Sequence, residues 1–138
     1  MEYGVNYFDT AEYYGYGQAE ILLGNAFKEL NVKREEIVVS TKIFRIKDIN
    51  QVGLSRKHVI EGTKNSLKRL QLDYVDIILA HRPDFDVPLE EICRAFSWVI
   101  DKGLAFYWAT SEWPADLITE AIQLCQKLNL HVPIAEQT

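Results

Sequence analysis

At 138 residues the chain is long enough for one domain with a hydrophobic core. Its hydrophobic fraction of 48% and charged fraction of 25% are ordinary for a globular protein, and its formal net charge of −5 argues against a nucleic-acid binder. The cysteines Cys93 and Cys125 lie in helix-like apolar stretches, so we expect reduced core residues and no metal site. The sequence has no membrane-spanning run and no signal-peptide pattern, so we expect a cytoplasmic protein.

Strand-like and helix-like stretches alternate along the whole chain. Strands are predicted where apolar and β-branched residues run together, and helices where apolar residues recur every three or four positions. In chain order the pattern predicts a strand over 5–9, a helix over 19–30, a strand over 37–42, a helix that begins after the N-cap Ser55 and runs to Leu70, a strand over 75–80, a helix over 89–102, a strand over 105–111, a helix over 115–128 and a strand over 132–136.

This alternation predicts a parallel sheet whose strands are joined by helices. A closed barrel of eight strands and eight helices takes roughly 250 residues, and this chain has about half of that. We therefore expect an α/β fold that forms part of a (β/α)8 TIM barrel. The prediction is about five parallel strands and four helices in a single incomplete domain over residues 1–138.

Four polar residues fall one each at the ends of successive predicted strands: Asp9, Lys42, His81 and Ser111. A tyrosine, Tyr14, follows the first of them by five positions. The C-terminal ends of barrel strands open on the same rim, so residues there converge although they are far apart in sequence. The chain is thus predicted to bring a carboxylate, a phenol, an amine and an imidazole together, which is a catalytic set.

Each of these residues also has a plainer interpretation. Asp9 could cap a strand end, Tyr14 could belong to a surface aromatic cluster, and Lys42 could extend past a buried strand to solvent. His81 could belong to an ordinary loop, and a serine such as Ser111 before an aromatic-proline pair is common turn chemistry. Taken singly, the plain interpretation is favoured for every one. The joint occurrence of four matching residue types at strand ends favours the catalytic interpretation.

The stretch FDTAEYYG over 8–15 resembles the aldo-keto reductase superfamily. Three later stretches are similar to the branch that includes the β-subunits of voltage-gated potassium channels. They are STKIF over 40–44, the long stretch over 53–77 with HRPD over 81–84, and YWATSEW over 107–113. The resemblance runs from the second strand of the family's barrel to the start of its sixth.

The resemblance implies NADPH-dependent reduction of aldehydes and ketones, with Asp9, Tyr14, Lys42 and His81 matching the family's catalytic tetrad. Reduction of a carbonyl needs a hydride on carbon and a proton on oxygen. A free phenol, with a pKa of about 10, is a poor acid unless a nearby ammonium stabilises its charged form. Lys42, held by Asp9, is expected to do this for Tyr14, while His81 orients the carbonyl oxygen.

By the same resemblance, Asp9, Ser111 and Gln137 would contact the nicotinamide of NADPH. The family's first strand and helix, and the loops after its sixth strand that grip the adenosine 2′-phosphate, have no counterpart in these residues. We therefore expect weak activity or none from this chain alone. Two further residues depart from the pattern of the family. Arg45 stands where the family often has a tryptophan, and Ala109 stands where a glycine is common.

Two other interpretations stay open. The chain could be a cytosolic regulatory β-subunit that binds the α-subunit of a voltage-gated potassium channel, and so lie at the membrane through that channel. It could also be an inert product of a partial gene. We further expect a homo-oligomer, because strands cut from a parallel barrel leave apolar surface and unpaired edges.

Overall fold

A computed structural model describes residues 4–47 and 49–138. These residues form five strands in one sheet and four α-helices. The strands are β1 (Tyr7–Asp9), β2 (Val38–Ile43), β3 (Val75–Ala80), β4 (Ala105–Ser111) and β5 (Glu136–Gln137). The helices are α1 (Gln18–Glu29), α2 (Arg56–Leu70), α3 (Leu89–Asp101) and α4 (Ala115–Lys127), and short 3-10 turns lie at Tyr14–Gly17, Arg34–Glu36 and Ile49–Gln51. No helix among the described residues has the length and apolar character needed to cross a membrane.

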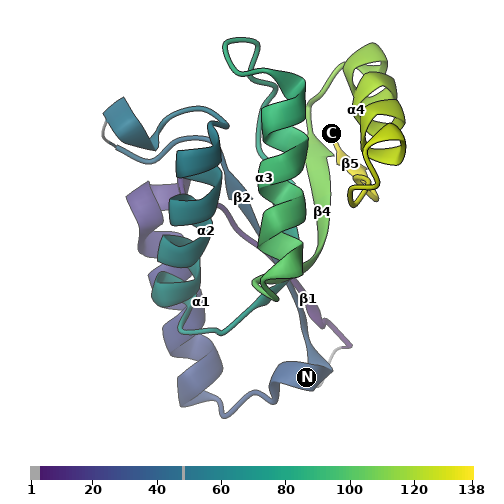
Figure 1. Ribbon diagram of the computed structural model, residues 1–138. Helices are drawn as coiled ribbons and strands as arrows, with labels where there is room; N and C mark the ends of the chain where they lie inside the picture. The colour runs from purple at the N-terminus through teal and green to yellow at the C-terminus, as the bar shows by residue number, and fades with distance from the viewer. Residues whose placement is uncertain (1–3, 48) are drawn as a thin grey trace.

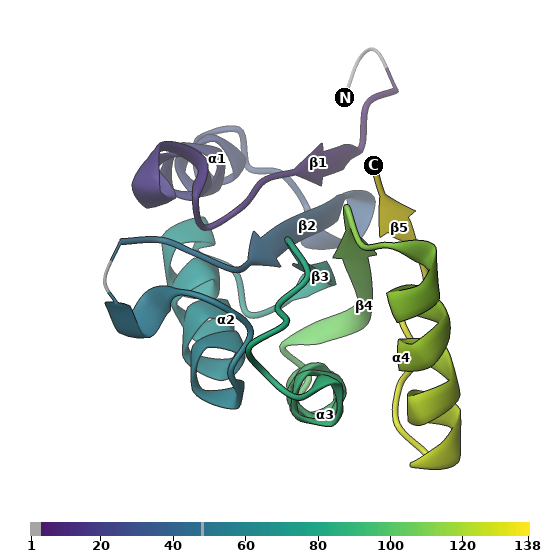
Figure 2. The same ribbon diagram turned by 90° about the horizontal axis from the view of Figure 1, so that it is seen from above.

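The sheet is fully parallel, and its strands lie in the same order as in the sequence, β1-β2-β3-β4-β5. Each of the first four strands is followed by a helix that returns the chain to the start of the next strand. The sheet curls, and the helices lie along its outer face (Figures 1 and 2). The predicted half-barrel of five parallel strands and four helices is confirmed.

The hydrophobic core fills the space between the sheet and the helices. The Trp108 ring from β4 stacks on the Phe96 ring from α3, with ring centroids 5.0 Å apart and planes 9° from parallel. Helices α1 and α2 meet at Gly24, where a Cβ atom would lie 2.4 Å from the carbonyl oxygen of Leu70. The two cysteines are buried free thiols, as predicted, and belong to the same core.

The predicted elements are all present, and most boundaries fall within a residue or two of the prediction. Ser55 caps α2 as expected, because its Oγ accepts a hydrogen bond of 3.2 Å from the amide of His58. The last strand is shorter than predicted, because only Glu136–Gln137 is regular. Pro133 interrupts the earlier part, since proline has no N–H to donate to a strand ladder. Ile134 nevertheless donates to the carbonyl of Trp108 at 3.0 Å, so the segment still follows β4.

Candidate active site

The C-terminal ends of the strands, and the turn after β1 that carries Tyr14, hold the residues that were predicted for the site. Because all the strands are parallel, these ends lie on one side of the sheet. There they surround a cavity of about 270 Å³. It is lined by Asp9, Tyr14, His81, Arg82, Ser111, Glu112, Gln137 and Thr138. Lys42 lies beneath it, bonded to Asp9 and Tyr14. We call Asp9, Tyr14, Lys42 and His81 the rim cluster.

Lys42 is the centre of the rim cluster. Its side chain is only 1% exposed, and its ammonium forms an ion pair with the carboxylate of Asp9. The same Nζ donates to the carbonyl of Thr10 at 3.0 Å and to the phenol oxygen of Tyr14 at 3.4 Å. A buried charge is tolerated only when it is paired and hydrogen-bonded, and these partners meet that condition. The ammonium is therefore held against the phenol by the fold.

A short chain of hydroxyl groups orients Asp9. The phenol of Tyr7 donates to Ser40 Oγ at 3.0 Å, and Ser40 Oγ donates to Asp9 Oδ1 at 2.5 Å. Asp9 Oδ2 is left for Lys42 and for the side-chain amide of Gln137, which lies at 3.4 Å. Ser40 precedes Lys42 by two positions on β2, so both side chains face the same side of the sheet. The sequence analysis did not identify Ser40 or Tyr7, although this period of two was available as a signal.

His81 follows β3 and meets Tyr14 edge to face, with ring centroids 5.8 Å apart and an interplanar angle of 82°. Its pKa is lowered from 6.5 to about 4, chiefly by burial and then by the positive charges of Arg82 and Lys42. The imidazole is therefore neutral at neutral pH. A neutral imidazole has one N–H, so His81 can donate a single hydrogen bond to an oxygen in the cavity.

Ser111 and Gln137 complete the far side of the cavity. Ser111 Oγ accepts a hydrogen bond of 3.4 Å from Arg82, whose guanidinium also pairs with Glu112 at 3.2 Å. The hydroxyl of Ser111 and the side-chain amide of Gln137 provide both donors and acceptors beside Asp9. These are the groups that a primary carboxamide needs, so the residues present fit the nicotinamide end of a dinucleotide.

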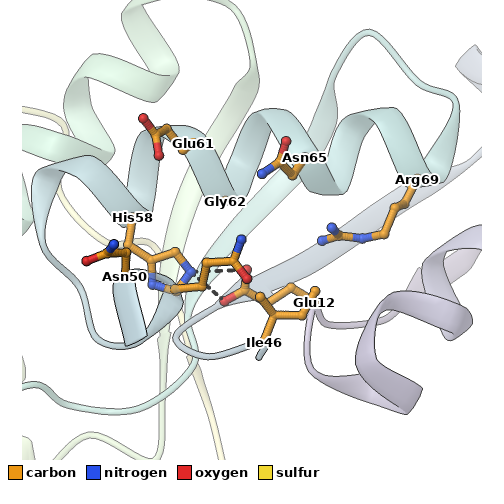
Figure 3. A pocket seen from close by; sticks show the side chains of 9 residues that line it. Glu12, Ile46, Asn50, His58, Glu61, Gly62, Asn65 and Arg69 are labelled. Carbon is orange, nitrogen blue, oxygen red and sulfur yellow. Dashed lines mark hydrogen bonds and ion pairs between the residues drawn. The ribbon is translucent and has the colours of Figure 1, made fainter. Parts of the chain in front are cut away.

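A second polar cluster lies on the helix side of the sheet, and the sequence analysis missed it. Glu12 Oε1 accepts from the amide of Phe44 at 2.8 Å and lies 3.2 Å from His58 Nε2 (Figure 3). Glu20 accepts from the hydroxyl of Thr41 at 2.5 Å and pairs with Arg69 at 2.6 Å. The buried cluster, as we call it, consists of Glu12, Glu20, Thr41, His58 and Arg69.

The buried cluster holds the loop that carries Tyr14. The amide of Glu12 donates to the carbonyl of Lys42 at 3.1 Å, and its carboxylate binds the amide of Phe44. Both bonds fasten Glu12, which lies two residues before Tyr14, to the C-terminal end of β2 and the residue that follows it. The cavity beside this cluster has a volume of about 30 Å³, room for about one water molecule. The buried cluster therefore positions the site and cannot itself admit a substrate.

Comparison with known proteins agrees with this architecture. The family model described as "Aldo/keto reductase family" matches residues 1–135. The chain belongs to the aldo/keto reductase family. This membership confirms the resemblance noted in the sequence, and the family's barrel accounts for the order of the strands.

The relatives also include the predicted branch. The chain is 56% identical over 137 residues to a protein of Arabidopsis thaliana named "Probable voltage-gated potassium channel subunit beta". It is 53% identical over 135 residues to a protein of Oryza sativa subsp. japonica with the same name. Among solved structures, a thermostable aldo-keto reductase in complex with the inhibitor epalrestat superposes with a TM-score of 0.85 at 33% identity.

The three matches cover nearly all of this chain but less than half of each relative. They span 99%, 97% and 98% of the chain, and 42%, 41% and 45% of the respective relatives. The described half-barrel thus corresponds to one part of each relative.

Proposed function

We propose that this aldo-keto reductase chain reduces the carbonyl group of aldehydes and ketones with NADPH. The observation that carries the proposal is the position of the Lys42 ammonium, between the carboxylate of Asp9 and the phenol of Tyr14. Tyr14 is 40% exposed and lines the cavity, so it can meet a substrate while its phenol oxygen stays within reach of the charge.

Each residue of the rim cluster has a definite role in this reaction. Tyr14 gives its proton to the carbonyl oxygen as the carbonyl carbon is reduced. Lys42 stabilises the negative charge that then develops on the phenol oxygen, and Asp9 keeps Lys42 in place. Neutral His81 donates a hydrogen bond to the carbonyl oxygen and orients it.

The cofactor would be held at its nicotinamide end by Asp9, Ser111 and Gln137. When bound, the nicotinamide supplies the hydride. The hydroxyl of Ser111 and the amide of Gln137 can pair with its carboxamide, which fixes the ring beside the rim cluster. Because the chain spans less than half of its relatives, we propose that its 138 residues form one incomplete domain and bind NADPH weakly by themselves.

Substitution of Tyr14 tests this function. In the full-length protein that carries this sequence, Tyr14→Phe removes the proton donor and leaves the residues of the nicotinamide site in place. Loss of a general acid typically costs 10²–10⁴-fold in rate. Steady-state reduction of an aromatic aldehyde with NADPH should fall by about that factor, while fluorescence titration shows unchanged NADPH affinity. Unchanged turnover would exclude Tyr14 as the acid and remove the basis of the proposal.

A second candidate function comes from the plant relatives, which are named as potassium channel β-subunits. We propose it as an alternative role, in which the chain binds the cytosolic side of a channel α-subunit and is held at the membrane by that contact. Co-expression with a voltage-gated potassium channel would test it. The alternative predicts co-purification and altered inactivation of the current, and channels that neither bind the protein nor change their current would exclude it.

We also propose that the isolated chain forms homo-oligomers. Tyr7 and Tyr107 lie on strands of the sheet and are 46% and 52% exposed. Exposed aromatic surface and unpaired edges of a parallel sheet favour association. Light scattering after size exclusion should show a mass above the 16.0 kDa of one chain. A monomer that unfolds cooperatively would contradict this.

A further inference from the structure

A second cavity adjoins the one that holds the rim cluster, and the proposed reaction does not use it. Its volume is about 250 Å³, and its lining residues are Tyr13, Phe44, Arg45, His81 and Arg82. His81 and Arg82 line both cavities. A substrate whose carbonyl oxygen lies at His81 can therefore extend into the second cavity. The second cavity would then enclose the part of the substrate that does not react.

The second cavity is aromatic and cationic. Two guanidinium groups and two aromatic rings line it, and none of the acidic side chains that the structure describes does. The carboxylates of Asp9 and Glu112 line the neighbouring cavity instead. A guanidinium presents a planar fork of N–H donors that matches a carboxylate with two parallel hydrogen bonds. The lining therefore favours a molecule with an apolar body and a negative charge.

The two guanidiniums differ in what they already bind. Arg82 pairs with Glu112 at 3.2 Å and donates to the carbonyl of His81 and the hydroxyl of Ser111. Arg82 thus already has an anionic partner within the site. Arg45 is exposed, in the loop that follows β2. Arg45 is therefore the residue that can accept a new anionic partner.

The loop that carries Arg45 is fastened at its base. The amide of Gly53 donates to the carbonyl of Phe44 at 2.6 Å, and Arg45 and Val52 form an antiparallel bridge. These contacts close the segment 44–53 on itself. Arg45 consequently lies at the base of a closed loop.

A further bond joins this loop to the one that carries His81 and Arg82. Asp84 follows them, and its Oδ2 accepts from the amide of Leu54 at 2.7 Å. The two loops pack so closely that a Cβ atom on Gly53, whose φ is +83°, would lie 2.4 Å from the same oxygen. The separation of Arg45 from His81 is thus set by contacts between the two loops.

We propose that Arg45 binds a carboxylate on the substrate, so that the site prefers aldehydes with a negative charge at the end remote from the reacting carbonyl. The proposal rests on the proposed carbonyl reduction and names its substrate class. The apolar body of such a substrate lies between the rings of Tyr13 and Phe44, while its carbonyl reaches His81 and Tyr14 in the adjoining cavity.

A matched pair of substrates tests this in the full-length protein. The probes are 4-formylbenzoate and its methyl ester, which has nearly the same shape without the charge. Arg45→Met removes the charged guanidinium and keeps an unbranched apolar side chain. Lys47→Met is the control, because it makes the same change in net charge two residues away and outside the cavity lining.

The expected result is a loss of about 10-fold or more in kcat/KM for 4-formylbenzoate in Arg45→Met, with an unchanged value for the ester. Lys47→Met should change neither value. The proposal would be overturned if the ratio of kcat/KM for 4-formylbenzoate to kcat/KM for its ester were equal in wild type and Arg45→Met. An equal loss of kcat/KM for 4-formylbenzoate in Lys47→Met would also overturn it. A binding titration with 4-(hydroxymethyl)benzoate, followed by NMR, measures the Arg45 contact without turnover.

The two proposals fail in different ways. If neither aldehyde is reduced but the carboxylate binds and Arg45→Met abolishes binding, the proposed reaction is wrong and the Arg45 contact stands. If both aldehydes are reduced and the carboxylate binds equally well to wild type and Arg45→Met, the reaction stands and the Arg45 proposal is wrong.

Discussion

The rim cluster and the buried cluster share strand β2 and the segment after β1 but differ in access. Strand β2 sends Thr41 to the helix side, where it bonds Glu20, and the next residue, Lys42, to the concave side, where it bonds Asp9. The period of two in a strand places these two neighbours on opposite faces of the sheet. Adjacent residues in one strand therefore serve two sites on opposite faces of the sheet.

Both clusters contain acid–base pairs, so a pair by itself does not identify the active site. The side chains of Glu12 and His58 are 1% and 2% exposed beside a cavity of about 30 Å³. The side chain of Asp9 is 27% exposed beside a cavity of about 270 Å³. What separates the cluster that can meet a substrate from the one that supports it is room for a molecule.

The largest effect is expected from Lys42→Met in the rim cluster. The substitution removes the ammonium 3.4 Å from the Tyr14 phenol oxygen and replaces it with an apolar side chain that suits a buried position. We expect kcat for an aromatic aldehyde to fall by about 10³-fold. The thermal unfolding temperature should fall as well, because Asp9 loses its ion-pair partner, so the rate is measured at a temperature where the variant is folded. The pH–rate profile should also change shape. Lys57→Met, which breaks an exposed pair with Glu61, is the control and should leave the rate unchanged. A variant as active as wild type would break the distinction between the clusters.

The next effect concerns His81 and acid stability. Its folded pKa of about 4 lies below the ordinary value of 6.5, so between these values the unfolded chain binds the proton and the folded chain does not. The resulting stabilisation is fully present above pH 6.5 and is lost as the pH falls to 4, by about 3 kcal/mol.

Denaturant unfolding at a series of pH values from 7 to 4 measures this loss of stability. His81→Asn should lose less stability over the range than wild type. Parallel curves for wild type and His81→Asn would show that His81 is not held neutral by the fold.

The smallest effect is expected in the buried cluster. Glu12→Ala leaves the Phe44 amide and His58 Nε2 without their partner, which should lower the free energy of unfolding by about 2 kcal/mol. Because Glu12 fixes the loop before Tyr14, kcat should also fall while KM is nearly unchanged. Glu12→Gln keeps an acceptor for the amide and should restore part of both losses.

The control for this variant is Glu61→Ala, at the exposed pair with Lys57. Such surface pairs contribute less than about 1 kcal/mol, so its unfolding curve should overlie that of wild type. If Glu12→Ala changed stability no more than Glu61→Ala, the buried cluster would not support the site as we describe.

The fold and the rim cluster were largely predictable, because both depend on local patterns. Alternating strand and helix stretches fix a parallel sheet, and a parallel sheet places Asp9, Lys42 and His81 at one edge wherever their strands end. Tyr14 lies beyond the strand end, and its assignment needed the family resemblance. The extent of β5 was wrong because the apolar residues around Pro133 suggested a strand that proline interrupts.

The buried cluster could not be predicted in the same way. An acidic residue in the stretch AEYY gives no sign that its carboxylate meets an amide 32 residues away and an imidazole 46 residues away. Those contacts depend on how α2 packs against β2, which is set by the whole core. The side chains of Thr41 and Glu20 likewise meet only because two elements that are apart in sequence become neighbours.

The central claim is that the rim cluster carries out hydride reduction of a carbonyl. The most direct test is transfer of deuterium from NADPH deuterated at both C4 positions to an aromatic aldehyde in the full-length protein, followed by mass spectrometry of the alcohol. The account predicts an alcohol with a single added deuterium from wild type and from Glu61→Ala, and almost none from Tyr14→Phe. An unlabelled alcohol from wild type would contradict the account, and so would an equal amount of labelled alcohol from Tyr14→Phe.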